Sequence, residues 1–135
     1  MFKINKKVEY ALMVLKHFKD NPAQELVTAR LVCDKYHTPF DTTSRVMQIM
    51  NGEGILGSSQ GVKGGYKLAR PLNSLNYLEL LELVEQKKFD QNCSDINCSL
   101  IDSCNITGPI QNLNKKLVQF FESITVSTLL EEHTN

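Results

Sequence analysis

The chain has 135 residues, of which 41% are hydrophobic and 22% are charged, and its 15 basic residues balance its 15 acidic ones. This length is enough for one domain with a buried core, and the composition is that of a globular protein rather than a disordered one. Zero net charge neither indicates nor excludes nucleic-acid binding, because a local basic face matters more than the total.

The sequence carries no signal for a membrane. No apolar run approaches the roughly 18 residues that a membrane-spanning helix needs. The start, MFKINKKVEY, lacks the continuous apolar stretch of a signal peptide. We therefore expect a cytoplasmic protein with no membrane partner, in a compartment where thiols stay reduced. For cysteines that cluster in the sequence, reduced thiols favour metal ligation over disulfides.

The first predicted helix is capped by Asn5 and runs to about Asp20. Its apolar residues recur at helical spacing and mark the face that should be buried. These residues are Val8, Ala11, Leu12, Leu15 and Phe18. The helix should end at Asn21-Pro22, because proline disfavours the α conformation of the residue before it.

A short second helix is expected over residues 28–35, with Leu31 and Val32 on its buried face. Cys33 falls on the same face and is far in sequence from the other three cysteines. We interpret it as a buried structural residue, since free cysteine usually behaves as a small apolar side chain. The turn at Tyr36-His37 then leads into a third helix.

Thr38 is predicted to cap this third helix, with Pro39 at its first position and Asp41 completing a start like a capping box. The helix should extend to about Asn51. Its expected inner face consists of Phe40, Thr43, Met47 and Met50. Two short helices joined by a tight turn, with the second one polar on its outside, are typical of helix-turn-helix DNA recognition.

The polar outer face of the third helix supplies candidate base contacts. Arg45 is our first choice, since arginine can bind guanine with two hydrogen bonds. Thr42, Ser44 and Gln48 lie on or beside the same face and could support it. The alternative interpretation is an ordinary solvated face.

Two strands are predicted over 55–60 and 66–70, around the glycine-rich sequence GVKGG. A hairpin directly after a recognition helix is a wing. Lys63 and Lys67 on this wing could meet phosphates or the minor groove. No GK[ST] sequence follows the glycines, so a nucleotide-phosphate loop is not indicated.

A fourth helix should start at Ser74 or Asn76 and reach about Gln86, and a long helix should start near Pro109. The long helix carries apolar residues spaced three, four, three and four positions apart, namely Ile110, Leu113, Leu117, Phe120 and Ile124. This heptad pattern predicts a homodimer, and such dimers are generally two-fold symmetric. The alternative is a helix that packs on its own domain. A short terminal helix is expected near 126–130.

Between the fourth helix and the long helix lies CSDINCSLIDSC, which holds Cys93, Cys98 and Cys104. Four residues separate the first pair of cysteines and five separate the second pair. Three thiolates this close in sequence suit an iron–sulfur cluster or zinc. The CxxC spacing usual for zinc is absent, which favours the cluster.

These parts together resemble the bacterial winged-helix regulators that respond to iron–sulfur status and nitric oxide (the IscR, NsrR and RirA type, or Rrf2 family). The resemblance rests on VEYAL, the recognition helix, NGEGILGSSQGVKGGYKLARP, the three-cysteine loop and SITVSTLLEE, and it spans nearly the whole chain. We therefore expect a mainly α fold with a small β-hairpin. The expected parts are a winged helix-turn-helix head over 1–88, a cysteine loop over 89–107 and a dimerisation helix with its tail over 108–135.

The resemblance implies a homodimer on a palindromic double-stranded DNA operator, with an iron–sulfur cluster bound at Cys93, Cys98 and Cys104. Three thiolates leave one ligand missing. In nitric-oxide-sensing relatives an acidic residue at the place of Glu9 is donated across the dimer. The alternative for Glu9 is a solvated carboxylate favoured by the helix dipole. Either [2Fe-2S] or [4Fe-4S] fits this ligand set, and we slightly favour [2Fe-2S].

The sequence departs from the family pattern at three places. Gln60 stands where many members carry arginine, the first cysteine gap is short, and Thr107 stands where some members carry a histidine ligand. We expect a transcription regulator that senses iron, nitric oxide or redox state. An enzyme is not indicated, since no Cys–His or Ser–His arrangement can be recognised. The alternatives are a zinc or thiol-redox site in the same regulator, and a cluster carrier that does not bind DNA.

Overall fold

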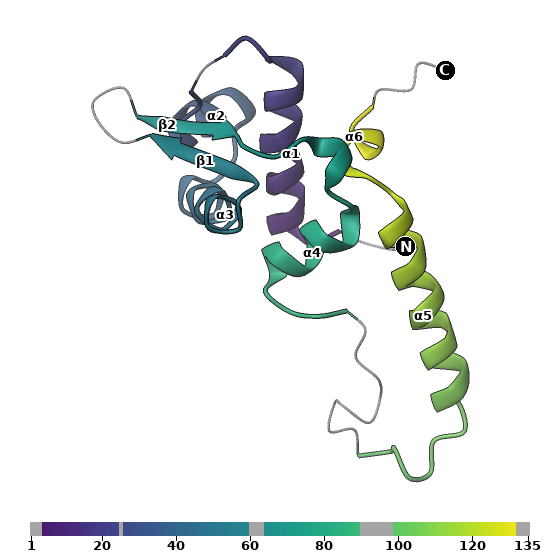
Figure 1. Cartoon of the computed structure of the whole chain (residues 1–135). Coiled ribbons are helices and arrows are strands. Elements are labelled where there is room, and N and C mark those ends of the chain that lie inside the picture. The colour runs from purple at the N-terminus through teal and green to yellow at the C-terminus, as the bar shows by residue number, and fades with distance from the viewer. Residues whose placement is uncertain (1–3, 25, 60–63, 90–98, 132–135) are drawn as a thin grey trace.

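The computed structural model describes residues 4–24, 26–59, 64–89 and 99–131. The predictions for Gln60, Lys63, Cys93 and Cys98 lie outside these residues. Within them the elements are α1 (Lys6–Asp20), α2 (Ala29–Tyr36), α3 (Phe40–Gly52), β1 (Leu56–Ser59), β2 (Gly65–Leu68), the 3-10 turn η1 (Leu72–Ser74), α4 (Tyr77–Glu85), α5 (Thr107–Ser123) and α6 (Val126–Leu129) (Figure 1). The predicted mainly α fold with a small hairpin is therefore confirmed.

Four of the described helices, namely α1, α2, α4 and α6, begin where a side-chain oxygen binds a free backbone N–H group of the first turn. Asn5 Oδ1 accepts from the N–H of Lys7 at 2.9 Å, which starts α1. Thr28 Oγ1 accepts from the N–H of the third residue after it at 3.1 Å, and Asn76 Oδ1 does the same at 2.8 Å. The sequence predicted these starts because the capping interaction is local.

The start of α3 differs from the prediction, and the assignment of Thr38 as its cap was wrong. Pro39 occupies the cap position and makes no side-chain hydrogen bond there. Thr38 is buried, and its hydroxyl donates to Cys33 Sγ at 3.6 Å and accepts from the Thr43 hydroxyl at 2.8 Å. Contact between α2 and α3 draws this threonine inward, away from the helix end.

The turn between α2 and α3 is made by His37, which takes the left-handed conformation with φ 59° and ψ 40°. Its N–H binds the carbonyl of Cys33 at 2.9 Å and closes the end of α2. Cys33 itself is 8% exposed, which confirms its interpretation as a buried structural residue. The two helices with this tight turn form the helix-turn-helix unit.

The wing is an antiparallel hairpin in which Leu56 pairs with Leu68 and Ser59 pairs with Gly65. Tyr66 also exchanges two backbone hydrogen bonds of 2.8 Å with Val27, so the segment before α2 lies along β2. A side chain at position 65 would come within 3.2 Å of the Val27 carbonyl oxygen. Glycine is needed there for this close approach.

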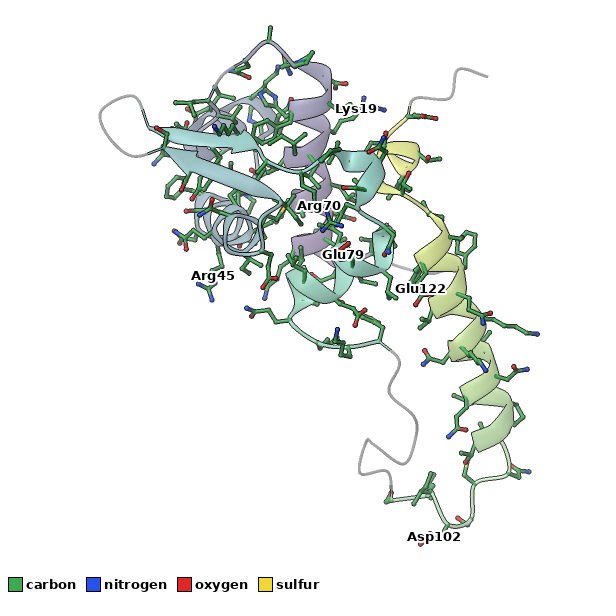
Figure 2. The ribbon with its side chains drawn as sticks, in the orientation of Figure 1. Lys19, Arg45, Arg70, Glu79, Asp102 and Glu122 are labelled. Atoms are coloured by element: carbon green, nitrogen blue, oxygen red, sulfur yellow. The ribbon has the colours of Figure 1, made fainter. Side chains whose placement is uncertain are left out.

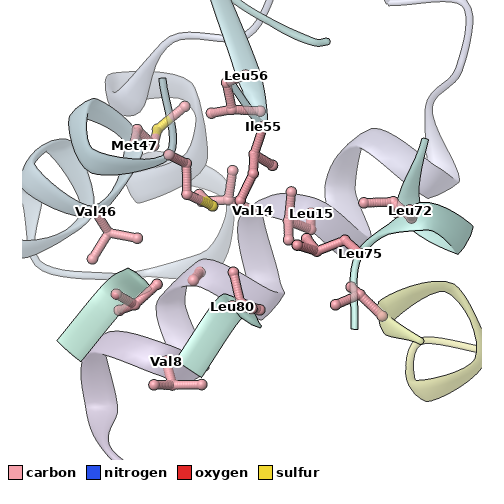
Figure 3. Packing of buried hydrophobic residues seen from close by; sticks show 14 of the residues in the cluster. Val8, Val14, Leu15, Val46, Met47, Ile55, Leu56, Leu72, Leu75 and Leu80 are labelled. Atoms are coloured by element: carbon pink, nitrogen blue, oxygen red, sulfur yellow. The ribbon is translucent and has the colours of Figure 1, made fainter. Parts of the chain in front are cut away.

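One hydrophobic core joins α1, α3, α4 and the start of the wing (Figure 3). Its largest fully buried apolar side chains are Leu15, Met47, Met50, Ile55, Leu56, Leu75 and Leu80. Because the same core supports α3 and the wing, their outward faces have a fixed relation to each other.

The long helix α5 projects away from this core in Figure 1. Phe121 is its buried residue among those described, and it packs edge to face on Tyr77 with ring centres 5.0 Å apart. The chain then returns, since the carbonyl of Ile124 accepts from the N–H of Tyr77 and the N–H of Val126 donates to Leu75, both at 2.8 Å.

Ile124 was predicted as the last heptad position of the long helix, and this prediction was wrong. It lies just beyond α5 in extended conformation, with φ −101° and ψ 121°. The hydrogen bond from the N–H of Tyr77 to the carbonyl of Ile124 holds Ile124 in this extended segment, next to the antiparallel bridge between Asn76 and Thr125. Among the helices of the described ranges, none is long and apolar enough to cross a membrane.

Candidate DNA interface and cysteine site

The outer face of α3 carries the predicted polar residues. Arg45 and Gln48 are exposed, and Thr42 and Ser44 are partly exposed. Arg45 points away from the core in Figure 2. The opposite face is buried and consists of Thr43, Val46, Met47 and Met50. The helix therefore has one apolar side in the core and one polar side that can enter a groove of DNA.

Phe40 was predicted on the inner face of α3, and this prediction was wrong. The residue is 41% exposed. The guanidinium carbon of Arg30, on α2, lies 4.4 Å from the centre of its ring. Phe40 is the first residue of α3 and lies at the end of the helix-turn-helix surface, where none of the described elements covers it.

Lys67 is exposed on β2 and pairs with Gly57 across the hairpin. Figure 1 shows the hairpin on the same side of the molecule as α2 and α3. The wing and the polar face of α3 can therefore approach one ligand together.

Arg70 is a residue of this region that the sequence analysis did not select. Its guanidinium donates to Glu79 Oε1 at 2.9 Å and to Glu79 Oε2 at 3.0 Å, and it also donates to the carbonyl of Ser74 at 2.6 Å. Figure 2 shows the two charged side chains together between the wing and α4. A spacing of nine residues across an irregular turn has no periodicity that would reveal such a pair.

Cys104 lies shortly before α5 and its side chain is partly exposed. The hydroxyl of Thr107 lowers the pKa of this thiol below its ordinary value, and the backbone N–H of Ile106 adds to the effect. The Thr107 hydroxyl oxygen is itself buried, and no hydrogen-bond partner for it is found among the described residues. A lowered pKa favours the thiolate, which is the form that binds metals.

Glu9 lies in the first turn of α1, half-buried, with its carboxylate 3.1 Å from Lys6 Nζ. In Figure 1 this turn and the start of α5 are far apart. Within residues 4–24, 26–59, 64–89 and 99–131, no three histidine, cysteine or acidic side chains come together as a metal site. Of the predicted ligands, the structure therefore describes Cys104 and Glu9, and it does not bring them together in one chain.

Comparison with known proteins identifies the family. The family model named Rrf2, described as an iron-dependent transcriptional regulator, matches residues 4–132. The chain belongs to the Rrf2 family. This Rrf2-family protein is accordingly a DNA-binding transcription regulator and not an enzyme.

Relatives and solved structures match this Rrf2-family protein over nearly its whole length. The transcriptional regulator NsrR of Shouchella clausii is 25% identical over 129 residues, which are 90% of this chain and 84% of the relative. NsrR of Oceanobacillus iheyensis is 27% identical over 134 residues, with coverages of 97% and 85%.

Two solved structures share the fold. CymR, the global cysteine regulator of B. subtilis, superposes with a TM-score of 0.74 at 13% identity and covers 96% of this chain and 97% of its own. IscR of T. potens gives a TM-score of 0.68 at 14% identity, with coverages of 99% and 94%. At these identities the likeness concerns the winged-helix architecture alone.

Proposed function

We propose that this Rrf2-family regulator is a homodimer that binds a palindromic operator and senses iron, nitric oxide or redox state through an iron–sulfur cluster. The observation that carries the proposal is the Cys104 thiol, which lies at the start of the long helix among groups that favour its thiolate form. The likeness to two proteins named NsrR supports it.

The donor set fits an iron–sulfur cluster. Cys93, Cys98 and Cys104 would supply three thiolates within twelve residues of sequence. When bound, the cluster would supply iron whose ligation and oxidation state respond to the signal. The contribution of the chain is to favour the thiolate form of Cys104 and to place it in the segment that leads into α5.

Glu9 is the proposed fourth ligand, donated by the partner chain. The choice of Glu9 rests on the family resemblance, and because the first turn of α1 and the start of α5 are far apart in one chain (Figure 1), Glu9 would have to serve the cluster of the partner chain. Glu9 would have to release Lys6, now 3.1 Å away. A hard carboxylate binds iron weakly, so this corner would be exchangeable and open to a signal molecule.

Dimerisation is proposed through the α5 seam, which we define as the exposed apolar residues of α5. Their exposures are 43% for Ile110, 62% for Leu113, 38% for Leu117 and 58% for Phe120. These positions recur with the coiled-coil spacing, so a second copy of α5 could cover all of them at once. A row of large apolar side chains on an otherwise polar helix marks an interaction surface.

DNA binding would place α3 of each head in the major groove, with Arg45, Thr42, Ser44 and Gln48 toward the bases. Lys67 and Lys63 on the wing would meet phosphates or the minor groove. The half-sites would lie about 34 Å apart, one turn of DNA. Because the cysteine loop joins α4 to α5, a change at the loop can alter the spacing of the two heads.

The test is to purify the protein without oxygen and to measure iron, sulfide and visible absorbance. The wild type should hold about two irons per chain if the cluster is [2Fe-2S], or about four if it is [4Fe-4S]. Cys104→Ser should lose the cluster, whereas Cys33→Ala should keep it. Glu9→Gln should change the visible spectrum, and Asp20→Asn, which also alters an ion-paired carboxylate of α1, should not. A protein without iron after anaerobic reconstitution would overturn the cluster.

A thiol-redox regulator is the second candidate. The lowered pKa and partial exposure of Cys104 favour it, and the fold is shared with the cysteine regulator CymR. A disulfide between two of the clustered thiols would release two electrons and two protons to an added oxidant such as diamide. In metal-free protein, operator affinity would then change with diamide, return with a reducing thiol, and be insensitive in Cys104→Ser. The same metal analysis would reveal zinc.

A further inference from the structure

Arg30 and Phe40 form an exposed pair at one end of the helix-turn-helix. The guanidinium carbon of Arg30 lies 4.4 Å from the centre of the Phe40 ring. Arg30 is exposed on α2, and Phe40 is 41% exposed as the first residue of α3. Contact of this kind orders a long cationic side chain against an aromatic face.

The position of the pair is the one that DNA binding uses. In helix-turn-helix proteins the N-terminal residues of the second helix contact base edges, while the first helix crosses the sugar–phosphate backbone. Phe40 begins α3, and Arg30 lies near the start of α2. An apolar ring at the first position of a recognition helix has a direct counterpart in the major groove, the 5-methyl group of thymine.

The charges around this end of α3 leave Arg30 as a group that can bind a phosphate there. Asp41, the next residue, is exposed and would repel a phosphate. No ion pair of Arg30 occurs among the residues that the structure describes, so stacking leaves its N–H donors open to another partner. A guanidinium held by its face presents its edge, and that edge matches phosphate geometry.

We propose that Phe40 and Arg30 make one composite DNA contact, in which the ring packs on a thymine methyl and the stacked guanidinium binds a nearby backbone phosphate. This inference rests on the proposed insertion of α3 into the major groove. It adds a source of sequence preference that is independent of Arg45 and specific for thymine over uracil. It also accounts for the exposed ring of Phe40, which does not pack in the core.

The expected changes in DNA affinity and in salt dependence follow from the two contacts. Burying one methyl group is worth about 0.8 kcal/mol, which corresponds to about a fourfold change in Kd. Loss of one phosphate contact lowers the slope of log K against log salt by about 0.9 per chain bound. The two halves of the pair therefore have separate signatures.

The experiment begins with the full-length protein and duplexes selected from random sequence. Each thymine of the selected site is replaced by uracil in turn, which removes only the methyl group. In the wild type, one thymine per half-site should lose about fourfold in affinity on this exchange. Phe40→Ala should bind thymine and uracil equally at that position, while Phe40→Leu, which keeps an apolar contact, should retain the preference.

The phosphate arm uses salt titrations on any duplex. Arg30→Ala should lower the salt slope by about 0.9 per chain, and Arg30→Lys should retain most of it. Lys87→Ala is the matched control, because Lys87 Nζ also lies over an aromatic ring, at 5.4 Å from the centre of Phe89, but just after α4. Its salt slope should equal that of the wild type.

Two results would overturn the inference. One is a Phe40→Ala protein that still distinguishes thymine from uracil as the wild type does. The other is an unchanged salt slope in Arg30→Ala. Failure of the proposed function would look different, since the wild type itself would then select no sequence and show no salt-dependent binding. Circular dichroism of each variant excludes loss of folding as the cause.

Discussion

Arg70 and Glu79 are joined by two parallel hydrogen bonds, at 2.9 Å and 3.0 Å, that use both carboxylate oxygens. The same guanidinium donates to the Ser74 carbonyl at 2.6 Å. Arg70 follows the wing, and Glu79 lies in the first turn of α4. Two parallel hydrogen bonds fix the orientation of the two side chains as well as their separation. They therefore help to set how the wing lies against α4, the helix before the cysteine segment.

The first prediction concerns these two parallel hydrogen bonds. Arg70→Lys keeps the charge but cannot make the two parallel bonds. It should lower the free energy of unfolding by about 1 kcal/mol, a modest value because the pair is partly exposed. Urea unfolding measures this, with Lys88→Ala as control, since Lys88 is 78% exposed and 3.6 Å from its partner Glu82. Equal losses in the two variants would contradict the special role of the two parallel bonds.

The second prediction concerns His17, which is 2% exposed and is the buried centre of a partly buried polar group. Its Nδ1 lies 2.6 Å from the Tyr36 hydroxyl and its Nε2 lies 2.7 Å from Gln24 Oε1. His17→Ala leaves a cavity and removes the partner of the partly buried Tyr36 hydroxyl, whereas the exposed Gln24 can bind water; it should lower the free energy of unfolding by roughly 3 kcal/mol.

Tyr36→Phe should cost about 1 kcal/mol, because it removes one hydrogen bond of the same network. The double variant with His17→Ala should lose less than the sum of the two single losses. Additive losses in thermal or urea unfolding would show that the hydrogen bond between these two residues is not a coupled one.

A third prediction uses two glycines of the wing. Gly65→Ala would place its Cβ 3.2 Å from both Leu26 Cβ and the Val27 carbonyl oxygen. The backbone there must shift, so the free energy of unfolding should fall by about 1–2 kcal/mol. In Gly57→Ala the nearest atom would be 3.6 Å away, an ordinary contact, and the loss should be smaller. The opposite order in thermal melts would show that β2 does not lie against Val27.

The fourth prediction addresses the α5 seam. Leu113 is 62% exposed, and Leu113→Asp puts a charge in the middle of the proposed dimer contact. The dimer should dissociate at concentrations at least tenfold higher than for the wild type, as measured by analytical ultracentrifugation. Lys116→Asp is the control on an exposed position of the same helix. If both variants behave alike, the seam is not the dimer contact.

The fifth prediction separates base contacts from backbone contacts. Arg45→Ala should relax sequence preference by about 1–3 kcal/mol at one base pair, because arginine reads guanine with two hydrogen bonds. Lys67→Ala should weaken binding on all sequences alike and lower the salt slope by about 1. Binding titrations on specific and random duplexes at several salt concentrations distinguish the two, and the reverse pattern would defeat the assignment.

The elements that the sequence predicted well are those set by local interactions. Asn5 and Asn76 bind N–H groups within three residues of themselves, so the sequence predicted the start of α1 and offered Asn76, beside Ser74, as the start of α4. Cys33 follows the apolar period of its helix into the core. The family resemblance, carried by segments that include the wing and the cysteine loop, predicted the class of regulator from the sequence.

The mistaken details depend on how neighbouring elements pack, which the local sequence pattern does not show. Thr38 has the chemistry of a cap, but the approach of α2 to α3 buries it against Cys33. Phe40 follows the apolar period of α3, yet it lies where the covering layer ends. Ile124 continues the heptad spacing, although its carbonyl pairs with Tyr77 and stops the helix before it.

The candidate site likewise has features that the sequence predicts and features that depend on the folded structure. The types and spacing of the cysteines indicate the chemistry of a site, but they do not fix where Glu9 lies relative to Cys104. The lowered pKa of Cys104 depends on the hydroxyl of Thr107 and on a backbone N–H at the start of α5. That environment exists only once α5 has formed.

The antiparallel bridge between Asn76 and Thr125 can form in a newly made chain only after the residues that follow α5 have been synthesised. Val126, 0% exposed, belongs to the core of the head, yet it leaves the ribosome after α1 to α5. Until it emerges, the backbone carbonyl of Leu75 has no partner N–H from this segment. The hydrophobic core is therefore completed only after the whole of α5 has been synthesised, so a chain stopped before Val126 lacks part of its core.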